Sequence, residues 1–361
     1  MTLDDFRALV LADEALQMDL ARIDEPGAFV ARVLELAGPG FATEDLAAAI
    51  RPDPVGITRL ATPPNASAWP SRHWLPVQAM GPSIDWAHFA GAALAEPFFT
   101  ESARRAMARP FNSLFRHVTA PGDFVANAES EGSLPPDGFI FHMSRCGSTL
   151  VAQMLAALPG SIVVSEAAPL AAAIASGSPD ALSAMVAALG RRRAGDETRY
   201  FLKLDFGHAL ALPLFRAAFP AVPWVFLYRE PVEVLVSQMR LPGLQALASP
   251  DRPREEAYAE ALAVVCDAAL AALDKGGGLA VNHADLPGAA ASILGHFGSA
   301  CGAGERALME PASRRHAKAP ETPYSGDADA KRRAATDAVR RAAEIHLAGP
   351  YRRLEALRRP F

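Results

Sequence analysis

Residues 144–149 read S-R-C-G-S-T, stand between two apolar stretches, and bring together residue types that bind anions. Arg145 supplies a fixed positive charge and a planar set of donors that suits oxyanions. Gly147 lets the backbone approach a ligand closely, while Ser148 and Thr149 add hydroxyl donors. The order differs from the nucleoside-triphosphate loop G-x-x-x-x-G-K-S/T, because the basic residue precedes the glycine. The segment predicts a local site for a phosphate-sized anion; the alternative is a polar turn capped by Ser148.

A second basic residue, Arg229, ends the apolar run within "FLYREPVEVLVSQM", residues 226–239. Ser237 follows eight residues later, about two turns into a helix predicted to begin at Pro231. Taken alone, a surface arginine beside an ordinary helical serine explains this segment as well. Two such strand-to-helix anion sites in one sheet would suit a nucleotide that carries phosphate at both ends of its ribose.

Two further charged residues end apolar runs, and each has a chemical and a structural interpretation. Glu166 ends "SIVVSE" and is the candidate general base; otherwise it is stabilised by a helix dipole. Lys203, in "FLKLDF", is costly to bury among apolar neighbours unless its ammonium points into a polar cleft. Otherwise Lys203 pairs with Asp205 or extends to solvent.

The remaining polar residues are interpreted as structural or as weak candidates. We expect His142 to be a buried, hydrogen-bonded imidazole and the basic run at 190–195 to be solvated. Further residues are considered for the edge of the sheet or for a late basic segment over a ligand: Asp205, His208, His283, Arg315 and Lys318.

From about residue 135, short β-like runs alternate with longer helical stretches. The runs are "GFIFHMS", "SIVVSE", "RYFLKLDF", "WVFLYR" and "GLAVNH". This alternation predicts an α/β fold, a parallel sheet wrapped by helices. Ligands of such sheets bind beyond the carboxyl ends of the strands, where the candidate residues above are expected to gather.

The chain before this sheet is predicted to be mainly helical. Apolar spacing predicts a helical unit at 1–50, with Thr2–Asp5 as a capping pair and Asp24 and Thr43 as further caps. Prolines predict an extended connector at 51–83. A helical lead-in is expected at 84–134, with aromatic core residues, and the sheet domain at 135–361. The core residues of the lead-in are Trp86, Phe89, Phe98 and Phe99.

Bulk composition narrows the function classes. The 361 residues carry a net charge of −5, which gives no general affinity for nucleic acid or an acidic membrane. The three cysteines, Cys146, Cys266 and Cys301, have neither disulfide-like nor metal-like spacing. The N-terminus has acid where a signal peptide needs base, and no apolar run approaches about 18 residues. We therefore expect a cytoplasmic protein with no metal, nucleic-acid or membrane partner.

Two of these motifs, in this order, resemble those of sulfotransferases. The S-R-C-G-S-T segment is similar to their 5′-phosphosulfate loop, and "LYREPVEVLVS" to their 3′-phosphate motif, R-D/E-P-x-D/E-x-x-x-S. "LAVNHADLPGAAASILGHFG" resembles a later strand and helix, so the likeness covers roughly residues 136–300. The resemblance implies a P-loop-like, three-layer core. It also implies in-line transfer of a sulfuryl group from 3′-phosphoadenosine 5′-phosphosulfate (PAPS) to a hydroxyl, without a metal.

The resemblance also assigns roles residue by residue. Arg229 and Ser237 would bind the 3′-phosphate, and Lys203 would stabilise the leaving group. Glu166 lies 21 residues after Arg145, a spacing similar to that of the catalytic glutamate of protein-tyrosine sulfotransferases. The 5′-phosphosulfate would be bound by the loop residues Arg145, Cys146, Gly147, Ser148 and Thr149, with Cys146 replacing a usual serine.

Residues 1–50 resemble the helical leader domain of nitrogen-fixation-type peptide precursors, most clearly at "GPGFATEDL". This likeness implies recognition of a peptide or a modifying partner; an unrelated three-helix cap is the alternative. The prediction is a PAPS-dependent sulfotransferase with a hydroxyl acceptor. The hypothesis for this acceptor is a peptide or natural product, and sugars, lipids and small phenols are the alternatives. The alternatives are a small-molecule kinase with a variant phosphate loop, and a non-catalytic protein that binds nucleotide or peptide.

Overall fold

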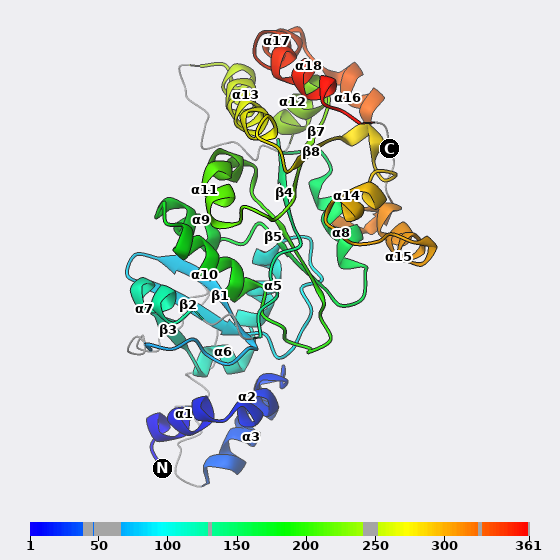
Figure 1. Ribbon diagram of the computed structural model, residues 1–361. Helices are drawn as coiled ribbons and strands as arrows, with labels where there is room; N and C mark the ends of the chain where they lie inside the picture. The colour runs from blue at the N-terminus through cyan, green and yellow to red at the C-terminus, as the bar shows by residue number, and fades with distance from the viewer. Residues whose placement is uncertain (39–45, 47–65, 129–131, 241–251, 324–326, 360–361) are drawn as a thin grey trace. The chain divides into compact units, whose positions relative to one another are not determined.

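The computed structural model describes residues 1–38, 46, 66–128, 132–240, 252–323 and 327–359 (Figure 1). The chain divides into two compact units. The first contains residues 1–135 and 167–197, and the second contains residues 136–166 and 198–361. Each unit is described by itself below.

The second unit is built on a five-stranded parallel sheet with the order β5-β6-β4-β7-β8. The central strand β4 pairs with β6 through Phe139↔Leu202 and with β7 through Phe139↔Trp224. The strands are β4 (Gly138–His142), β5 (Ser161–Ser165), β6 (Arg199–Lys203), β7 (Trp224–Tyr228) and β8 (Gly278–Asn282). Strands buried on both faces have near-continuous apolar sequences, as β4 and β7 do. The predicted α/β fold with a parallel sheet is confirmed.

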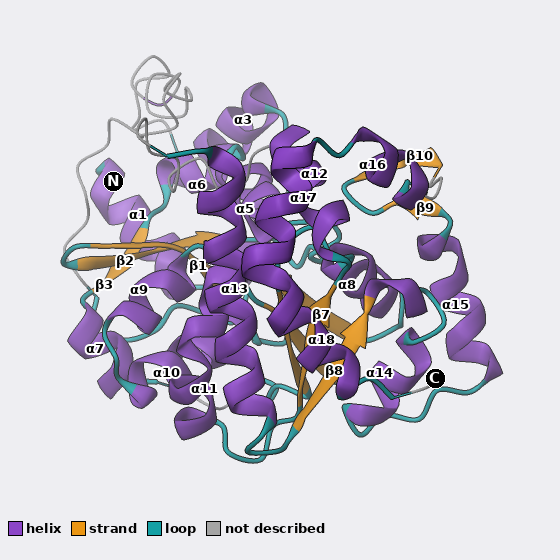
Figure 2. Ribbon diagram, turned by 90° about the horizontal axis from the view of Figure 1, so that it is seen from above, coloured by secondary structure: helices purple, strands orange, loops and turns teal. Residues whose placement is uncertain are grey.

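Helices cover both faces of this sheet and make three layers (Figure 2). On one side α8 (Ser148–Ala156) packs on β4, β5 and β6, and is covered by α14 (Ala290–His296) and α15 (Ala303–Ser313). On the other side lie α11 (Leu212–Ala218) and the long α13 (Arg254–Leu273). Phe215 of α11 meets the rings of Phe139 and Phe141 edge-on, at centroid distances of 5.2 and 5.3 Å. These contacts anchor the central strand that leads into residues 144–149.

The other elements of the second unit follow β6, β7 and β8 in the chain. Helix α12 (Pro231–Arg240) follows β7, and the short hairpin of β9 (Arg315–His316) and β10 (Ala319–Pro323) follows α15. Three α-helices lie at the end of the described chain, with a π-helical segment, Ala343–Leu347, between the last two. The α-helices are α16 (Ala328–Ala334), α17 (Asp337–Ala342) and α18 (Ala348–Ala356). Two 3₁₀ helices, Phe206–Ala211 and His283–Asp285, follow β6 and β8.

The first unit combines a three-stranded antiparallel sheet, of order β1-β2-β3, with short helices. Its strands are β1 (Trp74–Met80), β2 (Ser83–His88) and β3 (His117–Thr119). Its N-terminal helices are α1 (Leu3–Ala12), α2 (Glu14–Ala21) and α3 (Pro26–Ala37). The others are α5 (Phe99–Met107), α6 (Pro110–Leu114), α7 (Pro121–Ala126), α9 (Pro169–Ala175) and α10 (Pro179–Leu189).

The N-terminal helices differ from their predicted limits at the caps. The Thr2–Asp5 capping box is confirmed, with both of its hydrogen bonds present. The carboxylate of Asp13 then caps a new helix and so divides the first predicted helix into α1 and α2. Glu25, not Asp24, caps α3, because Asp24 pairs with Arg109 instead. The predicted helix after Thr43 lies outside the described residues apart from residue 46.

The strands at 74–88 replace part of the predicted connector and of the helical lead-in, and β3 lies in that lead-in too. Trp74 and Trp86 are buried by this pairing, which outweighs the proline signal. Pro76 is tolerated because β1 is an edge strand and its register shifts after that residue. Of the predicted aromatic core, Phe98 is only half-buried, whereas the other three are buried: Trp86, Phe89 and Phe99.

The basic run at 190–195 is only partly the solvated segment that was predicted, because two of its three arginines are buried. Arg191 and Arg193 are each only 4% exposed. The guanidinium of Arg191 lies over the rings of Trp69 and Trp86, at 5.7 and 5.8 Å, and donates to the Pro70 carbonyl at 2.7 Å. The aromatic faces and carbonyls compensate the buried charge of Arg191, so Arg191 and Arg193 belong to the core of the first unit, whereas Arg192 is exposed.

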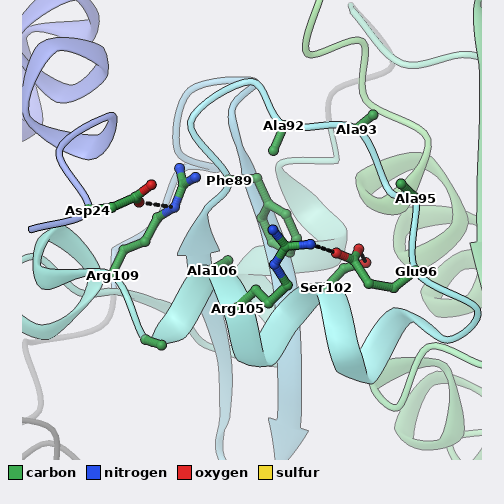
Figure 3. Close-up of a pocket in the computed structure, with 11 residues that line it drawn as sticks. Asp24, Phe89, Ala92, Ala93, Ala95, Glu96, Ser102, Arg105, Ala106 and Arg109 are labelled. Carbon is green, nitrogen blue, oxygen red and sulfur yellow. Dashed lines mark hydrogen bonds and ion pairs between the residues drawn. The ribbon is translucent and has the colours of Figure 1, made fainter. Parts of the chain in front are cut away.

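The first unit contains a cavity of about 410 Å³, lined by Phe89, by Arg105 of α5 and by Arg109, the N-cap of α6 (Figure 3). Both arginines are paired with carboxylates across the cavity. Arg109 pairs with Asp24 at 3.0 Å, and Arg105 pairs with Glu96. These pairs neutralise the positive charge of the cavity wall. None of the helices in the described parts of the chain is both long and apolar enough to cross a membrane.

Candidate active site

The loop between β4 and α8 has an unusual backbone. Ser144, Arg145 and Gly147 have positive φ angles of 68°, 52° and 89°. Residues other than glycine rarely adopt positive φ angles. Those that do are often found where a ligand or a reaction requires that backbone conformation. Left-handed residues in a loop of this kind turn successive backbone N–H groups toward one point, which favours an anion. Gly147 is also the N-cap of α8 and has no side chain to cap that helix.

Gly147 is required for a second reason, which is space. A Cβ at this position would lie 2.6 Å from Nδ1 of His283 and 2.8 Å from Cδ1 of Leu286. His283 follows β8, so a further strand end covers the loop. Burial, followed by the charge of Arg229, lowers the pKa of His283 to about 4. The imidazole over the loop is therefore neutral at physiological pH.

The side chain of Cys146 points into the core. Its thiol donates to the carbonyl of Leu227 at 3.2 Å, and burial raises its pKa to about 11. Only its backbone is therefore placed to contact an anion. Ser148 and Thr149 are buried at the first turn of α8, 5% and 4% exposed.

The two predicted anion elements touch directly. Nε of Arg145 donates to Oγ of Ser237 on α12, at 2.9 Å. The following residue, Gln238, donates from Nε2 to Oγ of Ser144 at 2.8 Å. Helix α12 thus holds the loop at two neighbouring residues.

Arg229 is buried between two carboxylates. Its Nε donates to Glu233 at 2.7 Å, and its Nη2 donates to Asp327 at 2.9 Å. Asp327 also accepts from Nζ of Lys331 at 2.7 Å. Burial by itself would raise the pKa of Asp327, but Lys331 and Arg229 hold it at about 2. An ionised carboxylate therefore lies where the sequence predicts a phosphate.

Glu166 and Lys203 come together at the ends of neighbouring strands. The ammonium of Lys203, whose side chain is fully buried, contacts Oε1 of Glu166. Nε2 of His142 lies 3.5 Å from the same oxygen. Glu166 has a φ of 53°, so it is a third non-glycine residue of the site, after Ser144 and Arg145, in the left-handed region. Lys203 thus makes an ion pair with Glu166, a partner not considered at the sequence level.

The charge state of Glu166 follows from these neighbours. Burial would raise its pKa, but the hydrogen bond from His142 and the charge of Lys203 lower it to about 2. The carboxylate is therefore ionised at neutral pH. It is 25% exposed, so it remains accessible from solvent.

Of the weaker candidates, His283 lies over the loop, and Lys318 is influenced by the charges of Arg145 and Lys203. Lys318 lies between β9 and β10, and its pKa falls to about 8 through partial withdrawal from water and repulsion by Arg145 and Lys203. Asp205 instead caps the 3₁₀ helix through the N–H of Gly207, at 3.0 Å. Within the described residues no three His, Cys, Asp or Glu side chains converge in a way that could hold a metal ion.

Sequence reasoning missed four members of the Arg229 cluster: Glu233, Asp327, Lys331 and Arg332, whose Nη1 donates to Glu233 at 2.6 Å. Glu233 lies four residues after Arg229 on α12, and that spacing is a usable signal for an ion pair. Lys331 follows Asp327 by the same interval. The contact between Arg229 and Asp327 spans 98 residues and has no local signal.

The chain matches no protein-family model and no curated protein. Several solved structures are similar to it. A sulfotransferase domain from the curacin biosynthetic pathway is 14% identical, with a TM-score of 0.41, over 59% of this chain and 98% of its own. Sulfotransferase STF1 from Mycobacterium tuberculosis is 15% identical, with a TM-score of 0.42, over 63% and 81%. A sulfotransferase domain from the Synechococcus PCC 7002 olefin synthase is 17% identical, with a TM-score of 0.38, over 60% and 96%.

Proposed function

We propose that the protein transfers a sulfuryl group from PAPS to a hydroxyl acceptor. The observation that carries this proposal is the contact between Arg145 and Ser237, which joins two strand-to-helix anion elements into one cluster. Nucleotides with phosphate on both sides of the ribose need two such elements close together. The Glu166–Lys203 pair at the same edge of the sheet adds a proton acceptor and a cation.

Each part of the donor has residues suited to it. The backbone of the 144–149 loop, the guanidinium of Arg145 and the hydroxyls of Ser148 and Thr149 would bind the 5′-phosphosulfate. Arg229 and Ser237 would bind the 3′-phosphate. PAPS brings an activated sulfur–oxygen bond, so the protein has to supply position and charge.

The transfer step uses Glu166 and Lys203. The acceptor oxygen forms a bond to sulfur while the bond between sulfur and the bridging phosphate oxygen breaks. The acceptor proton moves to Glu166, which is ionised at neutral pH and can accept it. A pKa of about 2 makes this carboxylate a weak base, so the proton moves only as the new bond forms and the hydroxyl becomes acidic. Lys203 would stabilise the negative charge that develops on the leaving oxygen.

The acceptor class that we propose is a peptide hydroxyl or a peptide-derived product. The leader-like helices α1 and α2 support it, together with the spacing of Glu166 from Arg145. Oε1 of Gln17 on α2 accepts from Nε1 of Trp74 at 2.8 Å, so these helices are part of the folded first unit. Peptide recognition is therefore tested with surface substitutions on α1–α3 and not by deleting the helices.

Replacement of Glu166 by Gln tests the proposal. We expect kcat to fall about 10²–10⁴-fold, the usual contribution of a general base, while affinity for adenosine 3′,5′-bisphosphate is kept. Radiolabelled PAPS with peptide and metabolite extracts measures transfer, and calorimetry measures binding. Glu344→Gln, on an exposed helical residue, is the matched control. Full transfer by Glu166→Gln would remove Glu166 as the base, and heat with ATP but not with the bisphosphate would favour a kinase.

A further inference from the structure

His142, the last residue of β4, is hydrogen-bonded on both sides of its ring. Nδ1 accepts from the backbone N–H of Ser144 at 3.0 Å. Nε2 lies 2.9 Å from the carbonyl of Leu204 and 3.5 Å from Oε1 of Glu166. The imidazole therefore bridges the anion loop and the carboxylate proposed as the base.

We propose that His142 is a positioning residue that holds the Ser144 turn and the Glu166 carboxylate in one geometry. This inference rests on the proposed function, because it assigns to His142 the coupling of donor binding to proton transfer. His142 does not touch the acceptor in this scheme. Its ring nitrogens are engaged by the protein, so it is not a second base.

The hydrogen bonds define the tautomer. A backbone N–H can only donate, so Nδ1 must carry a lone pair toward Ser144. The proton is then on Nε2, which donates to the Leu204 carbonyl and faces Glu166. With a proton on Nδ1, its N–H would face the backbone N–H of Ser144, and no hydrogen bond could form between the two donors. Burial of the ring also favours the neutral form and lowers its pKa.

The Ser144 contact matters because this residue begins the strained part of the loop. Ser144 and Arg145 both have positive φ, so the direction of the chain there needs support from outside the loop. His142 supports the backbone of Ser144, and Gln238 supports its hydroxyl. The position of the Arg145 guanidinium follows from this turn.

Three substitutions separate the two contacts. His142→Asn keeps an acceptor near the position of Nδ1 but is too short to reach Leu204. His142→Gln extends an amide toward Leu204 and loses the acceptor for Ser144. His142→Phe keeps the ring and loses both hydrogen bonds.

We expect a split between affinity and turnover. The Asn variant should bind adenosine 3′,5′-bisphosphate within about threefold of wild type and lose about tenfold in kcat, as one hydrogen bond is lost. The Gln variant should lose about tenfold in affinity and keep most of its kcat at saturation. The Phe variant should show both losses, and circular dichroism should show it folded.

The outcomes are distinct. Equal losses in the Asn and Gln variants, or normal binding and turnover in the Phe variant, would overturn the positioning role. Nitrogen NMR of the imidazole in the unliganded wild type gives a readout independent of activity. An Nδ1–H tautomer or a charged ring at pH 7 would contradict the role as well. If the wild type itself does not bind the bisphosphate, the proposed function fails, and the tautomer still tests the His142 geometry.

Discussion

Arg145 and Arg229 follow neighbouring strands of one parallel sheet, β4 and β7, yet their guanidinium groups are held in different ways. Arg145 is hydrogen-bonded to a neutral hydroxyl, that of Ser237. Arg229 lies between the carboxylates of Glu233 and Asp327. An anion can therefore approach Arg145 against little competition, whereas an anion at Arg229 must compete with an internal carboxylate. Similar motifs in the sequence thus lead to unlike electrostatic settings.

The pKa shifts of the two arginines follow the same contrast. Burial, and then the neighbouring charge of Arg229, lower the pKa of Arg145, although Asp327 acts against this. For Arg229 burial acts in the same direction, but the hydrogen bonds to Asp327 and Glu233 outweigh it and raise the pKa. We infer that the Arg145 region is prepared for a ligand and that the Arg229 region is stabilised without one.

The largest difference should be in stability. Arg229→Ala removes a partner shared by two carboxylates, although Glu233 keeps Arg332 and Asp327 keeps Lys331. We expect a loss of about 2–3 kcal/mol in the free energy of unfolding, because charge-assisted hydrogen bonds are lost. Arg145→Ala leaves only a hydroxyl and should cost about 1 kcal/mol. Urea denaturation of both variants measures the contrast, and equal losses would remove it.

Arg145→Ala should have a small effect on stability but a large effect on nucleotide affinity. Arg145→Ala removes a charge-assisted contact to the 5′-phosphate of the nucleotide, so we expect affinity for adenosine 3′,5′-bisphosphate to fall about 10–100-fold. The variant should remain folded, which makes calorimetry straightforward. Unchanged affinity would show that the 144–149 loop does not bind the nucleotide.

The internal carboxylate at Arg229 should act as a competitor of the 3′-phosphate. Asp327→Asn removes its charge, and we expect about threefold to tenfold tighter binding of the bisphosphate, more at low ionic strength. Asp329→Asn, on an exposed neighbour, is the control. Weaker binding by Asp327→Asn alone would mean that Asp327 supports the site and does not compete for it.

The smallest effect should come from Lys318, whose pKa is about 8. Between pH 7 and 9.5 it loses its charge, so we expect bisphosphate affinity to fall about threefold in the wild type and to stay flat in Lys318→Met. The contribution of Lys318 to stability should instead increase as the pH rises. The ordinary pKa is 10.5, so the unfolded chain binds more protons between about 8 and 10.5, and this residue's contribution to stability rises with pH there. A Lys318→Met binding profile identical to that of the wild type would exclude the residue from the site.

Local patterns predicted the parts of the site that depend on neighbours in the chain. Apolar runs ending in Arg145, Glu166, Lys203 and Arg229 placed these residues at strand ends, and a parallel sheet brings strand ends together. The pairing of Asp327 with Arg229 could not be predicted, because it joins residues 98 positions apart without a pattern. The proline content of the chain did not predict the strands β1 and β2, because these strands are stabilised by the burial of Trp74 and Trp86.

The 3′-phosphate gives the most direct test of the central claim, that the Arg145 and Arg229 elements together bind one nucleotide. Calorimetry should compare adenosine 3′,5′-bisphosphate with adenosine 5′-monophosphate on the wild-type chain. We expect one site per chain and at least about tenfold tighter binding of the bisphosphate, since its second phosphate adds charge-assisted contacts. Equal affinities for the two compounds, or no heat with either, would contradict the claim.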